Sequence, residues 1–171
     1  DNIGAARTEG FEADLNWRPE FAAGLTLYAN VAYTHARYKE FIDDCYAGQS
    51  FALGCNLDEF GDPTIFGSGV KQDQAGHQLK RSPDWVGAGG CIYERDLASN
   101  LRGVVNFNAS YTDPYQTDLH NSPNGIQDSL WKFDATARLV GGERDDWEVA
   151  LIGRNLTNEF AVTESSEDFI F

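Results

Sequence analysis

Apolar and polar residues alternate along much of this chain with the period of two that is typical of a β-strand. In residues 11–18, Phe11, Leu15 and Trp17 share one face of the expected strand, whereas Glu12 and Asp14 share the other. Three further stretches alternate in the same way and two have less regular faces: 25–34, 101–111 and 131–139, then 85–93 and 147–156. The sequence therefore predicts six long β-strands.

The connections between these strands alternate between short and long. Residues 18–24, 96–100 and 141–145 make tight joins, whereas residues 40–80 and 113–128 form long ones. An antiparallel meander with tight turns at one end and long loops at the other is the plan of a bacterial outer-membrane β-barrel. The predicted fold class is therefore all-β, an antiparallel meander of about six long strands that forms part of a transmembrane barrel. The two long connections are expected to be extracellular loops.

A soluble β-sandwich also has one buried and one wet face, so the positions of the aromatic residues matter. Tyr33 follows Leu25 by eight residues, and Tyr93 follows Trp85 by eight. At ~3.3 Å per residue and a tilt near 40°, this spacing spans roughly 20 Å, close to the apolar band of an outer membrane. Seven aromatic residues are expected at the two membrane interfaces: Trp17, Tyr33, Trp85, Tyr93, Tyr111, Trp131 and Trp147.

Composition narrows the classes of function. The net charge is -14, which disfavours nucleic-acid binding because that requires clustered Lys and Arg. No apolar run reaches the length of roughly 18 residues that marks a membrane-spanning helix. There is no Gly-x-Ser-x-Gly setting for a nucleophile and no phosphate-binding Gly-Lys-Ser/Thr loop, so we expect no enzyme activity. No cofactor and no metal site are expected.

Three segments resemble the C-terminal barrel of TonB-dependent outer-membrane receptors. They are residues 6–12 (ARTEGFE), 79–85 (LKRSPDW) and 153–159 (GRNLTNE), and their order and spacing agree with that family. The resemblance covers essentially all of residues 1–171. It implies a barrel of about 22 strands in the bacterial outer membrane, whose lumen is closed by a plug.

The resemblance also implies a function and partners. Receptors of this kind take up scarce nutrients, most often ferric siderophores and also haem, cobalamin or oligosaccharides, with force transmitted through TonB. The expected partners are thus outer-membrane lipid, TonB acting through a plug domain, and a small-molecule or metal-chelate ligand. The chain departs from the complete pattern because no plug is recognised and residues 168–171 do not form an alternating last strand, so we expect a barrel fragment.

The loops hold the candidate chemistry. Cys45 and Cys55 lie ten positions apart in the first long connection and are expected to form a disulfide, which would stabilise the fold by ~2 to 3 kcal/mol. Rings among acidic residues suit a sugar, an aromatic chelate or haem, and packing of the loops against each other explains them equally well. The candidate ligand-binding residues are Tyr46, Phe51, Phe60, Phe66, Tyr115 and His120. A secreted carbohydrate-binding β-sandwich remains the alternative function.

Overall fold

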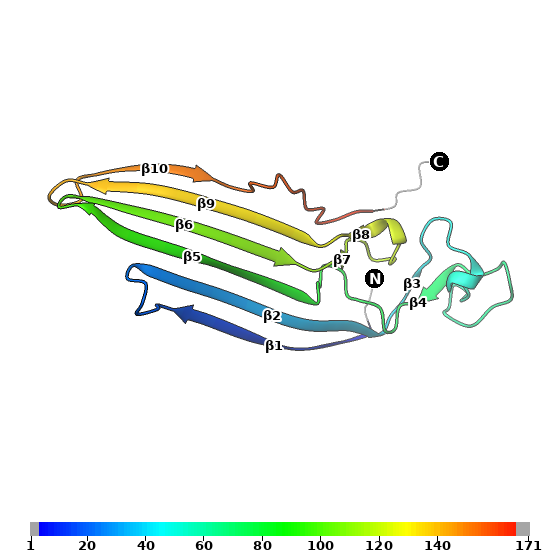
Figure 1. Ribbon diagram of the computed structural model, residues 1–171. Helices are drawn as coiled ribbons and strands as arrows, with labels where there is room; N and C mark the ends of the chain where they lie inside the picture. The colour runs from blue at the N-terminus through cyan, green and yellow to red at the C-terminus, as the bar shows by residue number, and fades with distance from the viewer. Residues whose placement is uncertain (1–3, 167–171) are drawn as a thin grey trace.

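Long antiparallel strands form one curved sheet in the computed structural model, which describes residues 4–166 (Figure 1). The sheet has six strands in the order β1-β2-β5-β6-β9-β10, so each strand pairs with its neighbour in the meander. The strands are β1 (Ala5–Trp17), β2 (Leu25–Glu40), β5 (Trp85–Ala98), β6 (Leu101–Thr112), β9 (Leu130–Gly141) and β10 (Trp147–Gly153). The meander of six strands is the predicted architecture.

The last predicted strand is too long by three residues. β10 ends at Gly153, whereas the sequence pattern ran to Leu156. Asn155 adopts a positive φ of 49°, and its backbone N–H donates to Asp134 Oδ1 at 2.7 Å. A left-handed residue turns the chain out of the extended path, so the strand stops before it. Residues 168–171, which were expected to lack a final strand, lie outside the described residues.

Short elements that the sequence did not predict occur within the loops. β3 (Ile42–Asp44) pairs with β4 (Lys71–Asp73), and β7 (Tyr115–Gln116) pairs with β8 (Ile126–Gln127). Two single turns of 3₁₀-helix, Phe51–Leu53 and Pro123–Gly125, complete the loops. The long connections are therefore structured hairpin-like excursions.

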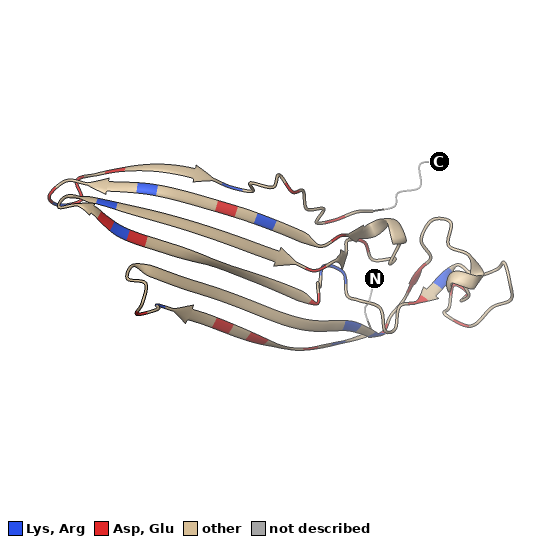
Figure 2. Cartoon of the chain, in the orientation of Figure 1, with Lys and Arg blue, Asp and Glu red and all other residues tan. Residues whose placement is uncertain are grey.

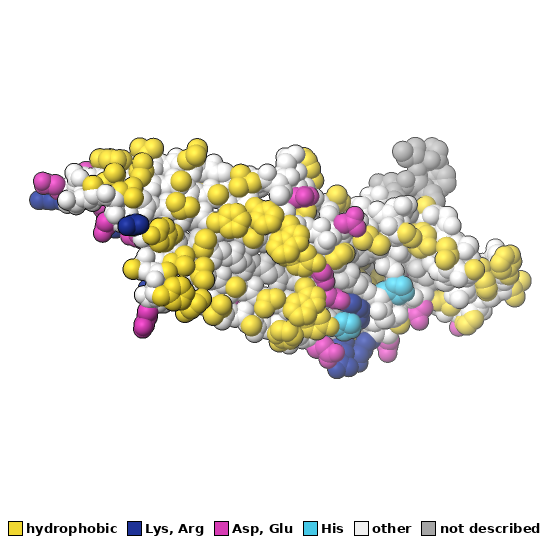
Figure 3. All heavy atoms as spheres, viewed as in Figure 1, with side chains coloured by type: hydrophobic (Ala, Val, Ile, Leu, Met, Phe, Trp, Pro, Cys, Tyr) yellow, Lys and Arg dark blue, Asp and Glu magenta, His cyan; other side chains and the backbone are white. Residues whose placement is uncertain are grey.

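One face of the sheet is apolar and exposed. Phe11, Tyr33 and Trp85 lie directly opposite one another on β1, β2 and β5. The ring centroids of Phe11 and Tyr33 are 5.7 Å apart, and those of Tyr33 and Trp85 are 4.8 Å apart. Figure 3 shows apolar side chains over most of the visible sheet face, with charged side chains gathered toward the strand ends. A solvated sheet would bury such a face, so this surface requires an apolar environment.

The other face carries the polar rows of the strands, and Figure 2 shows charged positions along β1, β5, β6 and β9. Tyr28 lies opposite Gly90, and Gly90 lies opposite Asn108. The Tyr28 hydroxyl reaches across the glycine, and its single hydrogen is shared between Asn106 Oδ1 at 3.3 Å and Asn108 Oδ1 at 3.4 Å. The register thus separates a mainly apolar face from a mainly polar face, with exceptions such as Val86 and Ile92 of β5 on the polar rows.

Much of the buried apolar core lies at the long-loop end of the sheet and not against either of its faces. Among the buried apolar side chains, Tyr38 and Phe41 lie where β2 enters the first long loop, and Leu57 lies within that loop, where its backbone bridges to Lys71. Within residues 4–166 the remaining sheets are two-stranded and occur in the loops, so no second sheet covers the apolar face. A β-sandwich requires such a second layer, which removes the structural basis of the soluble alternative. None of the helices in the described part of the chain is long and apolar enough to cross a membrane.

Candidate functional site: the long-loop end of the sheet

Both long loops leave the same end of the sheet and lie next to each other (Figure 1). We call residues 41–84, between β2 and β5, the first loop, and residues 113–129, between β6 and β9, the second loop. The tight turns between β1 and β2, β5 and β6, and β9 and β10 all lie at the opposite end. The length asymmetry that the sequence predicted is therefore also an asymmetry in space.

Buried glutamines of the first loop hold the backbone of the second. Gln72 Nε2 donates to the His120 carbonyl at 2.7 Å, and Gln74 Nε2 donates to the Leu119 carbonyl at 3.3 Å. Both glutamine side chains are buried. Asp43 Oδ2, which is also buried, lies 3.0 Å from His120 Nδ1. Since each contact joins the two loops, they form one packed unit rather than two independent flaps.

A disulfide closes a ring inside the first loop. Cys45 and Cys55 are bonded, with their Cα atoms 5.6 Å apart. Within this ring, Gln49 Nε2 donates to the Leu53 carbonyl, and it also donates to Gln72 Oε1 outside the ring, each at 2.9 Å. The ring is thereby connected to the same glutamine that contacts the second loop, so the disulfide and the loop junction stiffen one another.

The segment after β10 continues to the long-loop end of the sheet, where it contacts both loops. Arg81 Nε donates to the Thr163 carbonyl at 2.7 Å, and Tyr115 Oη donates to the Val162 carbonyl at 2.9 Å. Glu164 pairs with Lys80 at 2.8 Å and with Arg81 at 2.5 Å. The hydrogen bond from Lys80, aided by the charge of Arg81, lowers the pKa of Glu164. Lys80 and Arg81 belong to the LKRSPDW segment, so that segment connects three loop regions.

The first loop is closed at its base by an ion pair with β2. The two Arg37 terminal nitrogens donate to the two carboxylate oxygens of Asp84 at 2.8 and 2.7 Å. The Thr34 backbone N–H donates to the Asp84 carbonyl at 2.8 Å. The hydrogen bond from Arg37 lowers the pKa of Asp84, although partial burial opposes this effect. Asp84 therefore remains ionised at neutral pH and fixes the point where the loop returns to the sheet.

The structure separates the predicted ligand-binding residues into two groups. Phe60 and Phe66 in the first loop are each 83 % exposed, and Phe66 contacts Phe51 at a centroid distance of 5.5 Å. Tyr46 and Tyr115 are half-buried, and Tyr115 is bonded to Val162 as described above. His120 takes part in the loop junction through Asp43. Exposed rings thus belong to the first loop, whereas His120 joins the two loops and Tyr115 joins the second loop to the segment after β10.

Sequence reasoning missed two parts of this site. The exposed apolar surface near Phe66 also includes Leu53, Ile65 and Val70, whose exposure depends on how the loop folds. The buried pair Gln72 and Gln74 was not predicted either. The available signal was the spacing of two between them, which places both side chains on one face of an extended segment. That segment is β4 and the residue after it. Among residues 4–166 no group of three or more His, Cys, Asp or Glu residues could hold a metal ion.

The seven predicted interface aromatics all lie on the apolar face, in two groups toward opposite ends of the sheet. Trp17, Tyr93 and Trp147 lie near the tight turns, and Tyr33, Trp85, Tyr111 and Trp131 lie near the long loops. Rings of Tyr111 and Trp131 pack at 4.8 Å, as Tyr33 and Trp85 do. An exposed apolar band with aromatic residues toward both of its ends, on a meander of long antiparallel strands, defines the wall of a membrane β-barrel.

Comparison with known proteins gives the particular family. The family model described as TonB dependent receptor-like, beta-barrel, matches residues 1–156. The chain belongs to this family. Proteins of the family are receptors and transporters of the bacterial outer membrane and not enzymes. Neither the comparison with curated proteins nor the comparison with solved structures gave a match.

Proposed function

We propose that this barrel wall serves the TonB-dependent uptake of a ferric siderophore across the outer membrane. The observation that carries the proposal is the stiffened first loop, which presents the exposed rings of Phe60 and Phe66 at the long-loop end. Ligand sites of transport barrels lie at the mouth formed by their long loops. The partner that supplies force is TonB, acting through the plug domain that this family carries.

The proposed orientation places residues 40–80 and 113–128 outside the cell and the tight turns in the periplasm. It is supported by the family plan of short periplasmic turns and longer extracellular loops. The aromatic rows then lie at the two leaflets, where their amphipathic rings are favourable. The apolar face between them contacts outer-membrane lipid.

Aromatic rings favour a chelate over a bare cation. Phe51, Phe60 and Phe66 offer planar apolar surface, which stacks on the aromatic or apolar parts of a siderophore. Tyr46, Tyr115 and His120 complete the proposed contacts. Tyr46 lies within the disulfide ring, His120 lies at the junction of the two loops, and Tyr115 lies against the segment after β10. The acidic surroundings disfavour ligands with uncompensated negative charge, so the proposed ligand is a neutral or weakly charged ferric complex.

Iron uptake by cells that express the full-length receptor tests the proposal. The double variant Phe60→Ala, Phe66→Ala removes the exposed rings, and Phe21→Ala is the matched control. Phe21 is 84 % exposed but lies in the turn between β1 and β2, at the opposite end. We expect the double variant to weaken ferric-siderophore binding at least tenfold, at about 1 kcal/mol per ring, with Phe21→Ala unchanged.

Competition with haem, cobalamin and oligosaccharides distinguishes the ligand class. If the receptor binds one of these three ligands and none of the ferric siderophores tested, the proposed ligand is wrong. The proposed role as an uptake receptor would still hold. Loss of binding by Phe21→Ala to the same extent as by the double variant would contradict the location of the site.

A further inference from the structure

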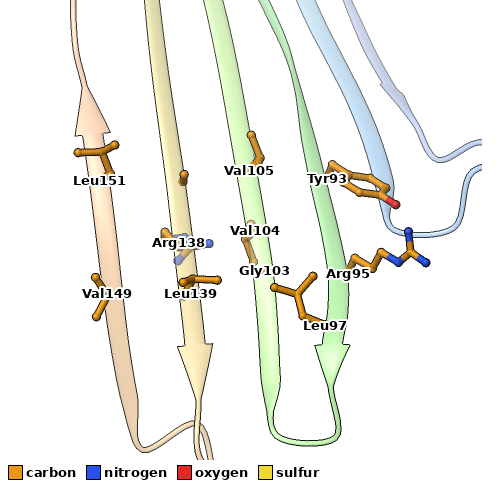
Figure 4. Close-up of a pocket in the computed structure, with 11 residues that line it drawn as sticks. Tyr93, Arg95, Leu97, Gly103, Val104, Val105, Arg138, Leu139, Val149 and Leu151 are labelled. Carbon is orange, nitrogen blue, oxygen red and sulfur yellow. The ribbon is translucent and has the colours of Figure 1, made fainter.

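An apolar groove crosses the exposed sheet face close to the tight turns. Its volume is about 530 Å³, and strands β5, β6, β9 and β10 contribute to it (Figure 4). Tyr93 and Leu97 come from β5, Val105 from β6, and Val149 and Leu151 from β10. The groove lies on the face that carries the aromatic rows, so it opens toward the surroundings of the barrel and not toward its lumen.

Small residues on the central strands create the hollow. Ala137 of β9 lies between Val105 and Leu151 in the register, and Gly103 of β6 lies opposite Leu139. A Cβ atom at Gly103 would approach Leu97 Cδ1 to 3.1 Å, so Leu97 already leans over the glycine. Larger side chains on both sides of Ala137 and Gly103 leave a hollow above these two residues.

A cation without an ionic partner lies at the edge of this groove. Arg95 follows Tyr93 by two positions on β5 and therefore lies on the same face, toward the tight turns, with its guanidinium extending from the edge of the groove toward the turn between β1 and β2 (Figure 4). Its neighbour Glu94 lies on the other face, where it pairs with Arg102 at 3.3 Å. Within residues 4–166 no carboxylate pairs with Arg95, and its side chain is exposed. An exposed guanidinium beside an apolar surface suits a ligand with a phosphate and an acyl chain.

We propose that the groove binds one phospholipid of the periplasmic leaflet. An acyl chain lies over Gly103 and Ala137, and the Arg95 guanidinium donates to the phosphate. Charge complementarity and continuity with the lipid-facing surface select this occupant, and the choice of leaflet rests on the orientation given under the proposed function.

A second groove on the same face provides an internal control. Its volume is about 470 Å³, and its lining includes Val31, Trp85, Ala109 and Trp131, near the long loops. No Lys or Arg is among its lining residues. It offers a comparable apolar surface without a partner for phosphate, so a lipid that requires both features will bind near Arg95 alone.

Native mass spectrometry of the detergent-purified, full-length receptor, titrated with phosphatidylglycerol, tests the proposal. Arg95→Gln removes the phosphate partner and Ala137→Leu fills the groove, while Ala109→Leu fills the control groove. We expect Arg95→Gln to weaken binding of the tightest phospholipid about fivefold, the effect typical of one basic contact. We expect Ala137→Leu to weaken it about fivefold as well, because the leucine occupies the space of the acyl chain. Ala109→Leu is expected to bind like the unmodified receptor.

The possible results separate this proposal from the receptor function. Unchanged binding by both Arg95→Gln and Ala137→Leu, or equal loss in all three variants, would overturn the lipid site. Preferential capture of lipopolysaccharide, the lipid of the outer leaflet, would also overturn it. Orientation is read separately in intact cells, where an impermeant maleimide should label Phe66→Cys but not Phe21→Cys. The proposed siderophore uptake is tested by the variants at Phe60 and Phe66, so a negative lipid titration would leave it intact.

Discussion

Arg37 and Asp84 form a two-point ion pair across 47 positions of the sequence, with N–O distances of 2.8 and 2.7 Å. The pair joins a residue near the end of β2 to the last residue of the first loop. About a quarter of each side chain is exposed, so water screens the pair only in part. At this position the ion pair closes the base of the first loop, residues 41–84.

Replacing Arg37 by Gln should loosen the base of the first loop. A charge-assisted hydrogen bond of this exposure is worth about 1 to 2 kcal/mol, so amide exchange at Thr34 and in residues 79–84 should accelerate roughly 5- to 30-fold. Hydrogen–deuterium exchange of the full-length receptor measures this. Arg7→Gln is the control, because the Arg7–Glu9 pair is more than half exposed on both sides. Equal exchange in Arg37→Gln and the parent would show that the pair adds nothing to loop closure.

The same pair predicts a pH dependence with a definite sign. Because the pKa of Asp84 is lowered in the folded state, its contribution to stability is present above the pKa of the unfolded chain. The contribution is lost as the pH falls through the folded-state value. The difference in exchange between the parent and Arg37→Gln, corrected for intrinsic rates, should be constant from about pH 7 to 5 and shrink below about pH 4. A difference that persists undiminished in strong acid would contradict this origin.

The disulfide should control the order of the exposed rings. Replacing Cys45 and Cys55 together by Ser opens a ring whose closure is worth about 2 to 3 kcal/mol, so residues 46–70 should become sensitive to limited proteolysis. Ferric-siderophore binding should weaken severalfold, because the free loop must then be ordered on binding. Cys91→Ala is the control, since Cys91 is the free cysteine and lies in β5. Unchanged cleavage in the double variant would show that the glutamine junction alone orders the loop.

The strands could be predicted from the sequence because alternation is a local signal that each strand carries by itself. The row Phe11, Tyr33 and Trp85 illustrates this, since all three residues were placed on the apolar face before their pairing was known. The end of β10 could not be predicted, because it depends on Asp134, a residue of the neighbouring strand that bonds the Asn155 backbone.

The loops illustrate the limit of the same reasoning. Gln72 and Gln74 donate to the backbone carbonyls of residues 120 and 119. Every residue has such a carbonyl, so the partner's residue type gives no indication of the contact in the sequence. Tyr115 and His120 were predicted as ligand contacts from their residue types, but nothing in the sequence indicated their bonds to Val162 and Asp43. Long-range hydrogen bonds of this kind are fixed only once the sheet has brought both loops to one end.

The contact between Tyr28 and Gly90 predicts which glycine of β5 the wall requires. A Cβ atom at Gly90 would lie 2.7 Å from Tyr28 Oη and 2.2 Å from the Phe107 carbonyl oxygen, so a neighbouring strand would have to shift. Gly89, one position earlier, would place a Cβ atom no closer than 3.3 Å to any neighbour. Gly90→Ala should therefore destabilise the folded barrel by about 2 to 3 kcal/mol, and Gly89→Ala by less than about 1 kcal/mol.

Urea unfolding of the full-length receptor in lipid vesicles, followed by heat-dependent gel migration, measures this difference. Tyr28→Phe keeps the ring over Gly90 and removes hydrogen bonds of 3.3 and 3.4 Å, so it should cost no more than about 1 kcal/mol. In the background of Tyr28→Ala, Gly90→Ala should become milder because the hydroxyl no longer occupies the space, although the Phe107 carbonyl still opposes the new methyl group. A Gly90→Ala effect that is as small as that of Gly89→Ala would mean that β5 tolerates a side chain beneath the tyrosine.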